Sequence, residues 1–492
     1  MTATTTPIDV LIVGAGISGI GMAYHLKTFR PGTSFVVLEG RDTIGGTWSL
    51  HQYPGIRSDS DMPTFGFGFK PWTHRKAIAD GHIILDYLQQ TVAENHLADH
   101  LQLGYRVQTA NFDSRHGLWT VTTTHQGQAA TFTSRFLFLG TGYYDYENPY
   151  IPDFPGVDDF EGPVIHPQLW PTDLDYAGKN VVVIGSGATA VTLIPNMADK
   201  AAHVTMLQRS PSYVFSIPAS DPTANVLNKV LGHERAYKIV RRKNIALART
   251  LFKLCMRYPK LMRKLLIANV ARQLPEGFDV DTHFSPNYNP WQQRLAMVPD
   301  GDLFQTISSG KASVVTDHIE RFTKHGILLR SGQELAADII VSATGLNMTP
   351  FGKITLSVDD KPVNLPDHMV YKAMMLSGVP NMAFAIGYTN IAWTLKVDLV
   401  CEHFCRLLDY MDEHNYGTVV PVFDDPTMER LPLMDMTSGY VQRAVAKFPH
   451  GGTSGPWTLK HAYEVDVERL RNGPVEDPAL AFTPATSSLS VA

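Results

Sequence analysis

Short apolar runs that end in glycine-rich turns recur along the chain. Two of them, Asp9–Val13 and Val181–Ile184, are each followed by such a turn, a helical stretch and a second apolar run. A short apolar run bounded by glycine is typical of a buried strand, so each segment predicts a βαβ unit. The turns are Gly14-Ala15-Gly16-Ile17-Ser18-Gly19 and Gly185-Ser186-Gly187-Ala188-Thr189-Ala190, and the second apolar runs are Phe35–Leu38 and His203–Leu207.

Two later apolar runs, Phe136–Leu139 and Ile339–Ser342, end in turns of small residues. Such turns let the backbone leave one dinucleotide-binding unit for another. We therefore predict an α/β protein of two nested dinucleotide-binding (Rossmann-like) domains with a helical insertion. The expected boundaries are residues 1–146 and 337–492 for the first domain, 147–221 and 286–336 for the second, and 222–285 for the helical insertion.

The helical insertion is strongly basic. Between Arg235 and Pro275 there are twelve Lys or Arg residues and no Asp or Glu. Apolar residues such as Ile239, Leu247 and Leu254 alternate with these cations, a pattern typical of an amphipathic helix on an anionic membrane or partner. The other interpretation is a helix that covers a substrate pocket and has a solvated basic face. Peripheral membrane contact through residues 235–272 is thus one of two hypotheses.

Net charge and cysteine content limit the possible partners and the cellular compartment of the protein. The net charge is 42 − 47 = −5, which argues against general nucleic-acid binding. Three cysteines without a framework spacing indicate a reducing compartment, and the absence of a Cys-x-x-Cys pair excludes dithiol chemistry. The histidines have no metal-ligand spacing, so no metal site is expected.

The N-terminal stretch is not expected to be a signal peptide or a membrane span. Residues 1–9 lack the basic start of a signal peptide. The uncharged stretch 10–26 contains four glycines, which a strand–turn–helix explains better than a membrane span. We expect a cytoplasmic protein. Residues 473–492 are rich in Pro, Ala, Ser and Thr and are expected to be disordered.

The first glycine turn is suited to a dinucleotide. Gly14 permits the tight turn, Gly16 permits close approach of a pyrophosphate, and Gly19 permits close packing of helix on strand. Glu39 follows Gly19 by twenty residues, where a carboxylate accepts hydrogen bonds from a ribose diol. The first domain is therefore expected to bind a dinucleotide through these four residues.

The second turn differs at the position that selects the cofactor. Gln208-Arg209-Ser210 stands where a ribose-binding acid would stand, and Arg209 can hold a 2′-phosphate with two hydrogen bonds. This pattern favours NADPH over NADH. Two dinucleotide sites in one chain imply hydride transfer from nicotinamide to a flavin, FAD in the first domain. The expected NADPH-binding residues are Gly185, Ser186, Gly187, Ala188, Thr189, Gln208 and Arg209.

Two longer motifs make a resemblance specific. Residues 160–171, FEGPVIHPQLWP, match FxGxxxHxxxWP, and residues 45–59 match GGxWxxxxYPGxxxD. The chain therefore resembles the type I Baeyer–Villiger monooxygenases. Related N- and S-oxidising flavin monooxygenases usually carry another aromatic residue at the position of Trp170. Further sequence segments, such as Gly387-Tyr-Thr-Asn390, are similar to those of the ethionamide-activating monooxygenases of mycobacteria. This resemblance extends over nearly the whole chain.

The resemblance implies a catalytic pair. A peroxyflavin anion that survives to attack a carbonyl needs a fixed positive charge, and arginine suits this role because it stays protonated. The matching residue here is Arg294, and Asp59 would orient it. Gln293 stands where many family members have a lysine that helps to bind the 2′-phosphate. His166 lies in a segment that connects the two domains, so we assign it to conformational coupling and not to the chemistry.

The resemblance also extends the cofactor sites. Thr47, Trp48 and Asp59 are expected along the flavin side of the cleft, Ser18 at the FAD phosphates and Val107 at the adenine. Arg57 and Ser58 are expected near the nicotinamide half of NADPH.

The expected activity is an FAD- and NADPH-dependent insertion of one atom of O₂ into a small ketone, with sulfides or thioamides as further substrates. Two alternatives stay open: a flavin monooxygenase that oxidises only nitrogen or sulfur, and a non-catalytic flavin-binding module that senses NADPH.

Overall fold

The larger of two central sheets belongs to the first domain. The computed structural model describes residues 6–485. Nine strands form this sheet in the order β18-β17-β4-β5-β6-β1-β2-β3, and β21 also pairs with β6. β1, β2, β3, β6 and β21 run parallel, whereas β4, β5 and β6 form an antiparallel meander. The strands are β1 (Ile8–Val13), β2 (Phe35–Glu39), β3 (Leu101–Leu103), β4 (Arg106–Asp113), β5 (Leu118–His125), β6 (Gln128–Leu139), β17 (Thr355–Val358), β18 (Lys361–Pro362) and β21 (Met382–Phe384).

Alternate residues of β1 face two separate apolar cores. Val10 and Ile12 contact the core shared with helices α1 (Ile17–Phe29), α4 (Gly81–Glu94) and α11 (Thr394–Glu413). Leu11 and Val13 face the opposite core, which contains side chains of the meander. A strand buried on both faces reads as a continuous apolar run, which is why the sequence pattern identified it.

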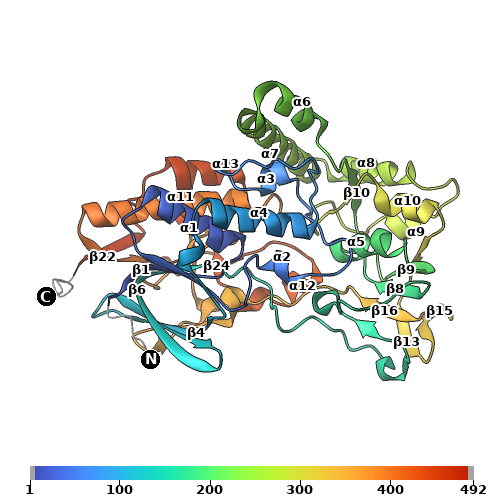
Figure 1. Cartoon of the computed structure of the whole chain (residues 1–492), viewed down its shortest axis with the longest axis horizontal. Coiled ribbons are helices and arrows are strands. Elements are labelled where there is room, and N and C mark those ends of the chain that lie inside the picture. Colours follow the sequence, from blue (N-terminus) through green and yellow to red (C-terminus); the bar gives the residue numbers. More distant parts are fainter. Residues whose placement is uncertain (1–5, 486–492) are drawn as a thin grey trace.

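The second sheet is parallel throughout and has the order β12-β9-β8-β16-β7. Helices α5 (Ala188–Met197) and α10 (Asp302–Ser308) pack on it. Its strands are β7 (Val164–Ile165), β8 (Asn180–Ile184), β9 (His203–Gln208), β12 (Ala312–Thr316) and β16 (Ile339–Ser342). Two Rossmann-type sheets lie side by side in Figure 1, and the α/β fold class expected from the sequence is confirmed.

One expected boundary is corrected by the sheet pairing. The sequence analysis ended the second domain at residue 336, but β16 lies in the second sheet between β7 and β8. Val341 pairs with both Ile165 and Val183, so this strand is central and fully buried. The chain therefore returns to the first domain only after residue 342.

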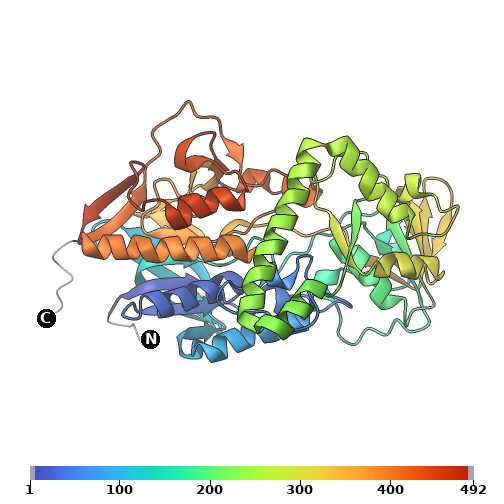
Figure 2. The same cartoon turned by 90° about the horizontal axis from the view of Figure 1, so that it is seen from above.

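The helical insertion projects from the body. It contains α6 (Pro222–Leu231), α7 (His233–Arg257), α8 (Pro259–Ala271) and α9 (Val280–Phe284). Figure 1 places α6, α7 and α8 at the top of the molecule, and Figure 2 shows α7 uncovered when it is seen from above. Arg241 anchors α7: its guanidinium donates to the carbonyl oxygens of Pro63, Thr64 and Gly66 and pairs with Asp398 of α11 at 3.3 Å.

The C-terminal stretch differs from the expectation of disorder. β25 (Leu480–Pro484) pairs with β22 (Tyr416–Pro421), and Val475 and Leu480 are buried. Backbone pairing and these apolar side chains therefore order the stretch despite its content of proline and alanine. Residues 473–485 are thus ordered, and the rest of that prediction lies outside the described residues. The shorter elements are α2 (Thr47–Leu50), α3 (Met62–Phe65), α12 (Gly439–Gln442), α13 (Tyr463–Asp466), β10 (Val214–Ile217), β11 (Ala296–Pro299), β13 (Ile319–Thr323), β14 (Gly326–Leu329), β15 (Glu334–Ala336), β19 (Val370–Tyr371), β20 (Met375–Leu376), β23 (Leu431–Pro432) and β24 (His450–Gly451).

Within residues 6–485, no helix combines the length and the apolar character that crossing a bilayer requires.

Candidate active site

The first glycine turn brings three backbone segments into close contact. Gly14 has a φ of 100°, and a Cβ added there would lie 2.8 Å from the carbonyl oxygen of Gly140. A Cβ on Gly19 would lie only 1.8 Å from the carbonyl oxygen of Gly14. No side chain caps the start of helix α1 after Gly16, so the backbone amides of its first turn are available to another hydrogen-bond acceptor.

Glu39 ends β2 beside this turn. Its carboxylate accepts hydrogen bonds from the backbone amides of Ala15 at 2.8 Å and Arg41 at 3.0 Å. Burial raises the pKa of Glu39, and the amide hydrogen bonds partly oppose that rise. The carboxylate is therefore fixed at the strand end, in the place predicted for a ribose-binding acid.

The two motifs of the first domain meet in space. Gly45 donates its amide to the carbonyl of Ala15 at 2.9 Å, and a Cβ on Gly46 would lie 3.2 Å from the Cα of Gly16. The segment that carries Thr47 and Trp48 therefore passes directly over the first glycine turn. The Thr47 hydroxyl lies 3.4 Å from the hydroxyl of Tyr146, and the Trp48 ring packs edge-on against Phe65.

Ser18, expected at the FAD phosphates, and Val107, expected at the adenine, are both buried. The Ser18 hydroxyl accepts a hydrogen bond from the indole nitrogen of Trp393 at 2.9 Å, a contact that the sequence did not indicate. Val107 lies on β4 next to Arg106, whose Cα would be 3.6 Å from a Cβ on Gly40. The residue after Glu39 thus adjoins the strand that carries Val107.

The second glycine turn has the same construction. Gly185 has a φ of 139°, and a Cβ there would lie 2.4 Å from the carbonyl oxygen of Ala343. A Cβ on Gly187 would meet no atom within 4 Å, and α5 begins at Ala188 without a side-chain cap. The Ser186 hydroxyl lies 2.8 Å from that of Ser212. Tyr53, which belongs to the first domain, packs in the same apolar core as Val191 and Ile194 of α5.

The two residues after β9 have different surroundings. Gln208 is buried, and its amide nitrogen donates to the carbonyl of His283 and the hydroxyl of Thr316, both at 2.8 Å. Arg209 is exposed and forms no ion pair with any residue between 6 and 485. The structure therefore buries Gln208 and leaves the guanidinium of Arg209 accessible, and their contact with NADPH stays a prediction.

Arg57 and Ser58 lie where the two domains touch. Arg57 forms an ion pair with Asp302, the first residue of α10 in the second domain. Ser58 is buried, and its amide donates to the carbonyl of Ala79 at 2.9 Å. A Cβ on the nearby Gly55 would lie 2.1 Å from the amide nitrogen of Asn196, so this loop packs directly on α5.

Arg294 and Asp59, predicted as the catalytic pair, are in contact. The Nε of Arg294 lies 2.7 Å from Oδ2 of Asp59, and the two side chains are 32% and 36% exposed. Arg294 lies near the end of the loop that connects α9 to β11. Thr437 holds this loop, because its amide and its hydroxyl both donate to the carbonyl of Gln292 at 3.0 Å. The pair is therefore partly accessible and held from behind.

Three tyrosines surround this arginine, and the sequence analysis did not include them. Burial alone would lower the pKa of Arg294, but Asp59 raises it above its ordinary value. The guanidinium thus stays charged throughout the physiological pH range. The positive charge of Arg294 in turn partly opposes the rise that burial causes in the pKa of Tyr143, Tyr144 and Tyr440. Tyr143 and Tyr144 follow the turn Gly140–Gly142 directly, a signal that was available in the sequence. Tyr440 is almost 300 residues away from them, and no local pattern marks it.

His166 connects the two crossover turns. Its Nε2 lies 3.1 Å from the carbonyl oxygen of Gly345, and its Nδ1 accepts a hydrogen bond from the amide of Gln168. Gln168 in turn donates to the carbonyl of Asp145 at 2.9 Å. The segment 160–171 therefore binds the loops after β6 and β16 together, and the role of His166 in conformational coupling stays a prediction.

His51 is expected to make the protein sensitive to acid. Burial, and then His166 and Arg41, lower the pKa of His51 from 6.5 to about 4. The folded state disfavours protonation of His51, whereas the unfolded chain protonates this histidine below pH 6.5. The free energy of unfolding is therefore unaffected by His51 above pH 6.5 and decreases as the pH falls from 6.5 toward 4. At pH 5 the loss amounts to about 2 kcal/mol. Thermal unfolding at pH 7 and pH 5 measures it, and His51→Gln should lose less stability on acidification than the parent. An equal loss in both proteins would contradict this assignment.

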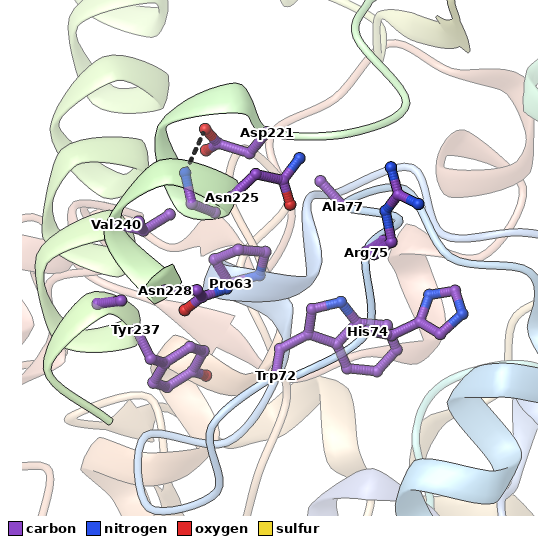
Figure 3. Close-up of a pocket in the computed structure, with 12 residues that line it drawn as sticks. Pro63, Trp72, His74, Arg75, Ala77, Asp221, Asn225, Asn228, Tyr237 and Val240 are labelled. Carbon is purple, nitrogen blue, oxygen red and sulfur yellow. Dashed lines mark hydrogen bonds between the residues drawn. The ribbon is translucent and has the colours of Figure 1, made fainter. Parts of the chain in front are cut away.

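A separate pocket lies between the helical insertion and the first domain (Figure 3). Trp72, His74 and Arg75 line one side, and Asp221, Asn225 and Asn228 line the other. None of the predicted site residues contributes to it.

The comparisons with known proteins agree with this geometry. The sequence profile of the pyridine nucleotide-disulphide oxidoreductase family matches residues 11–248. The FAD-containing monooxygenase EthA of Mycobacterium tuberculosis (strain ATCC 25618 / H37Rv) is 50% identical over 488 residues, which cover 99% of this chain and 100% of that protein. The chain belongs to the FAD-containing monooxygenases. The EthA of Mycolicibacterium smegmatis is also 50% identical to this monooxygenase, with 99% of each chain covered.

Solved structures share the fold of this monooxygenase at low sequence identity. A steroid monooxygenase bound to NADP has a TM-score of 0.75 and 20% identity, and it covers 97% of this chain and 100% of that chain. The open form of cyclohexanone monooxygenase has a TM-score of 0.75 and 19% identity over the same shares. The expected membership of the flavin monooxygenases, close to mycobacterial members, is confirmed.

The first domain of this monooxygenase fits FAD. The uncapped start of α1, the crowding at Gly14 and Gly19 that excludes larger side chains, and the fixed carboxylate of Glu39 meet the needs of a pyrophosphate and a ribose. The three cysteines are all buried, and burial raises the pKa of each thiol. They are poorly suited to redox chemistry, which agrees with a flavin that acts on oxygen.

Proposed function

We propose that this FAD-containing monooxygenase is a Baeyer–Villiger enzyme that uses NADPH and converts ketones to esters, with sulfides or thioamides as additional substrates. The observation that carries the proposal is the contact of Arg294 with Asp59 at 2.7 Å. It puts a permanent cation in a partly exposed position between two dinucleotide-type folds. The names of two structural neighbours, cyclohexanone monooxygenase and steroid monooxygenase, support a carbonyl substrate.

The roles of the residues follow from their positions. FAD, when bound and reduced by NADPH, supplies the activation of O₂. Arg294 would stabilise the negative charge that develops on oxygen, because its raised pKa keeps it protonated. Asp59 would fix the direction of the guanidinium through its contact with Nε. The tyrosine cluster Tyr143, Tyr144 and Tyr440 would limit access of water to the same cation.

Product analysis tests this proposal. Purified enzyme with NADPH and air should convert at least one member of a panel of cyclic and linear ketones to an ester or lactone, detected by gas chromatography. An enzyme that oxidises only nitrogen or sulfur would convert sulfides and leave every ketone unchanged. A flavin-binding module that only senses NADPH would give no oxygenated product from either panel.

Arg209 is expected to determine the preference for NADPH. Its exposed guanidinium is available for the 2′-phosphate, and loss of that charge-assisted contact raises the KM for NADPH by about 30- to 150-fold in Arg209→Ala. The KM for NADH should change little. Steady-state NAD(P)H oxidation measures both. Arg209→Lys is the matched variant, which should retain part of the preference; equal weakening of both coenzymes would overturn the assignment.

A further inference from the structure

Exposed apolar side chains are concentrated in the helical insertion. Among residues 6–485, fifteen large apolar side chains are exposed, and ten of them lie between residues 226 and 265. A scattered exposed leucine is normal on a protein surface, but a concentration of this kind marks an interaction surface. The ten are Val226, Val230, Leu231, Ile239, Leu247, Leu254, Met256, Tyr258, Leu261 and Leu265.

Helix α6 has its polar and apolar sides reversed relative to a helix that packs on a core. Val226 and Val230, one helical turn apart, are 62% and 73% exposed. Asn225 and Asn228 point the other way and line the pocket in Figure 3. A surface helix normally turns its apolar stripe toward the protein. The apolar side of α6 therefore faces solvent and points away from its own domain.

Helices α7 and α8 expose leucines between cations. Ile239, Leu247 and Leu254 lie along the outer side of α7, and Leu261 and Leu265 lie along that of α8. Exposed lysines and arginines flank each of them, and no acidic residue interrupts the series from 235 to 275. We call the exposed side chains of α6, α7 and α8 the insertion face.

Most cations between residues 235 and 275 have no carboxylate partner. Arg241, Lys243, Arg249 and Lys253 form ion pairs with residues of neighbouring elements. The others form no ion pair with any residue from 6 to 485, so their charge is available to an external anion. The exposed ones are Arg235, Lys238, Arg242, Arg257, Lys260, Lys264 and Arg272, whereas Arg263 is half-buried and donates to the hydroxyl of Ser285 at 3.2 Å.

We propose that the insertion face binds the surface of an anionic lipid bilayer. Leucine and valine side chains would enter the interface between headgroups and acyl chains, while lysine and arginine would reach the headgroup phosphates around them. Figures 1 and 2 place these helices outermost on one side, so a flat surface reaches them without movement of the two domains. The proposal does not depend on the reaction that the enzyme catalyses.

Two other occupants fit the charge pattern less well. A second copy that used the same face would bring two clusters of unpaired cations together, and like charges at an interface oppose association. An acidic protein would need matching pockets, whereas the exposed apolar residues lie on projecting helices. Both occupants remain outcomes of the test.

Cosedimentation of the FAD-loaded enzyme with vesicles tests the role of charge. Vesicles of equal parts phosphatidylglycerol and phosphatidylcholine should bind the enzyme at low salt, and pure phosphatidylcholine vesicles should bind it far less. Lys260→Glu/Lys264→Glu should weaken binding at least about tenfold. Lys179→Glu/Lys200→Glu changes the net charge by the same amount at exposed lysines elsewhere and should bind like the parent. Equal weakening in both double variants would overturn the proposal.

A second pair of variants tests the apolar contribution. Leu261→Ser/Leu265→Ser should reduce vesicle binding, and the reduction should persist at high salt because it does not depend on charge. Ile151→Ser/Val422→Ser replaces two exposed apolar residues outside the insertion face and is expected to have no effect. The flavin content of each variant verifies the fold. Absence of parent binding at low salt, or self-association lost in the Leu variants without any vesicle binding, would reject a lipid partner.

Discussion

Arg294→Ala is expected to abolish ester formation while oxidation of NADPH continues. Hydride transfer requires only that the nicotinamide meets the flavin, and Arg294 is not needed for that contact. Oxygen insertion instead requires a fixed cation beside the developing negative charge. Loss of one such group in a water-poor site commonly costs about 3–4 kcal/mol, which corresponds to a fall of about 10²–10³-fold in product formation.

Three measurements on the same variant separate these steps. NADPH oxidation, oxygen consumption and product yield should show that reducing equivalents leave as hydrogen peroxide and no longer enter the ester. Arg294→Lys keeps a positive charge but cannot reproduce the Nε contact with Asp59, so it should retain a small part of the yield. Asp59→Asn should resemble Arg294→Ala in direction, with a smaller effect. Ester formation near the parent rate in Arg294→Ala would exclude this residue as the catalytic cation.

Gly19→Ala is expected to destroy the FAD site by adding a single methyl group. The new Cβ would lie 1.8 Å from the carbonyl oxygen of Gly14, which is a backbone atom of the same turn. Because a backbone atom cannot move away as a flexible side chain can, helix α1 must shift from β1. Overpacking commonly costs about 1–3 kcal/mol, and a clash of this size should reach or exceed the upper limit.

The flavin content and the midpoint of thermal unfolding measure this effect. Gly19→Ala should be purified with little or no bound FAD and with a lowered midpoint. Gly32→Ala is the matched control, since a Cβ there meets no atom within 4 Å and the backbone needs no positive φ. The control should keep its flavin. Full flavin occupancy in Gly19→Ala would mean that the turn is more tolerant than its geometry indicates.

Local patterns in the sequence were sufficient for the framework of both dinucleotide folds. The turn that contains Gly14 requires a positive φ and close approach of the backbone, which glycine permits. The residue type therefore predicts the local structure at this position. The contact of Arg294 with Asp59 could be anticipated only through the family resemblance, because 234 intervening residues separate them in the sequence. Spacing alone carries no information about such a pair.

The features that sequence reasoning missed depend on long-range partners. β16 reads as a buried strand, but its sheet is decided by pairing with Val183 and Ile165. β25 lies in a Pro-, Ala-, Ser- and Thr-rich stretch that predicts disorder, and it is ordered by its pairing with β22. Asp302 is the partner of Arg57 only because α10 begins at the domain contact. Each of these outcomes requires coordinates from another part of the chain.

The origin of the two members of the proposed catalytic pair restricts how this enzyme can be engineered. Asp59 belongs to the first domain and Arg294 to the second, and Tyr53 and Gly55 contact α5 across the same boundary. A chimera that takes one domain from a relative would therefore inherit only half of the pair, on a foreign contact surface. Exchange between relatives should succeed only when the loop 53–59 moves together with α5 and the loop 288–294. Residues on both sides of the domain boundary must therefore be exchanged together to preserve this pair.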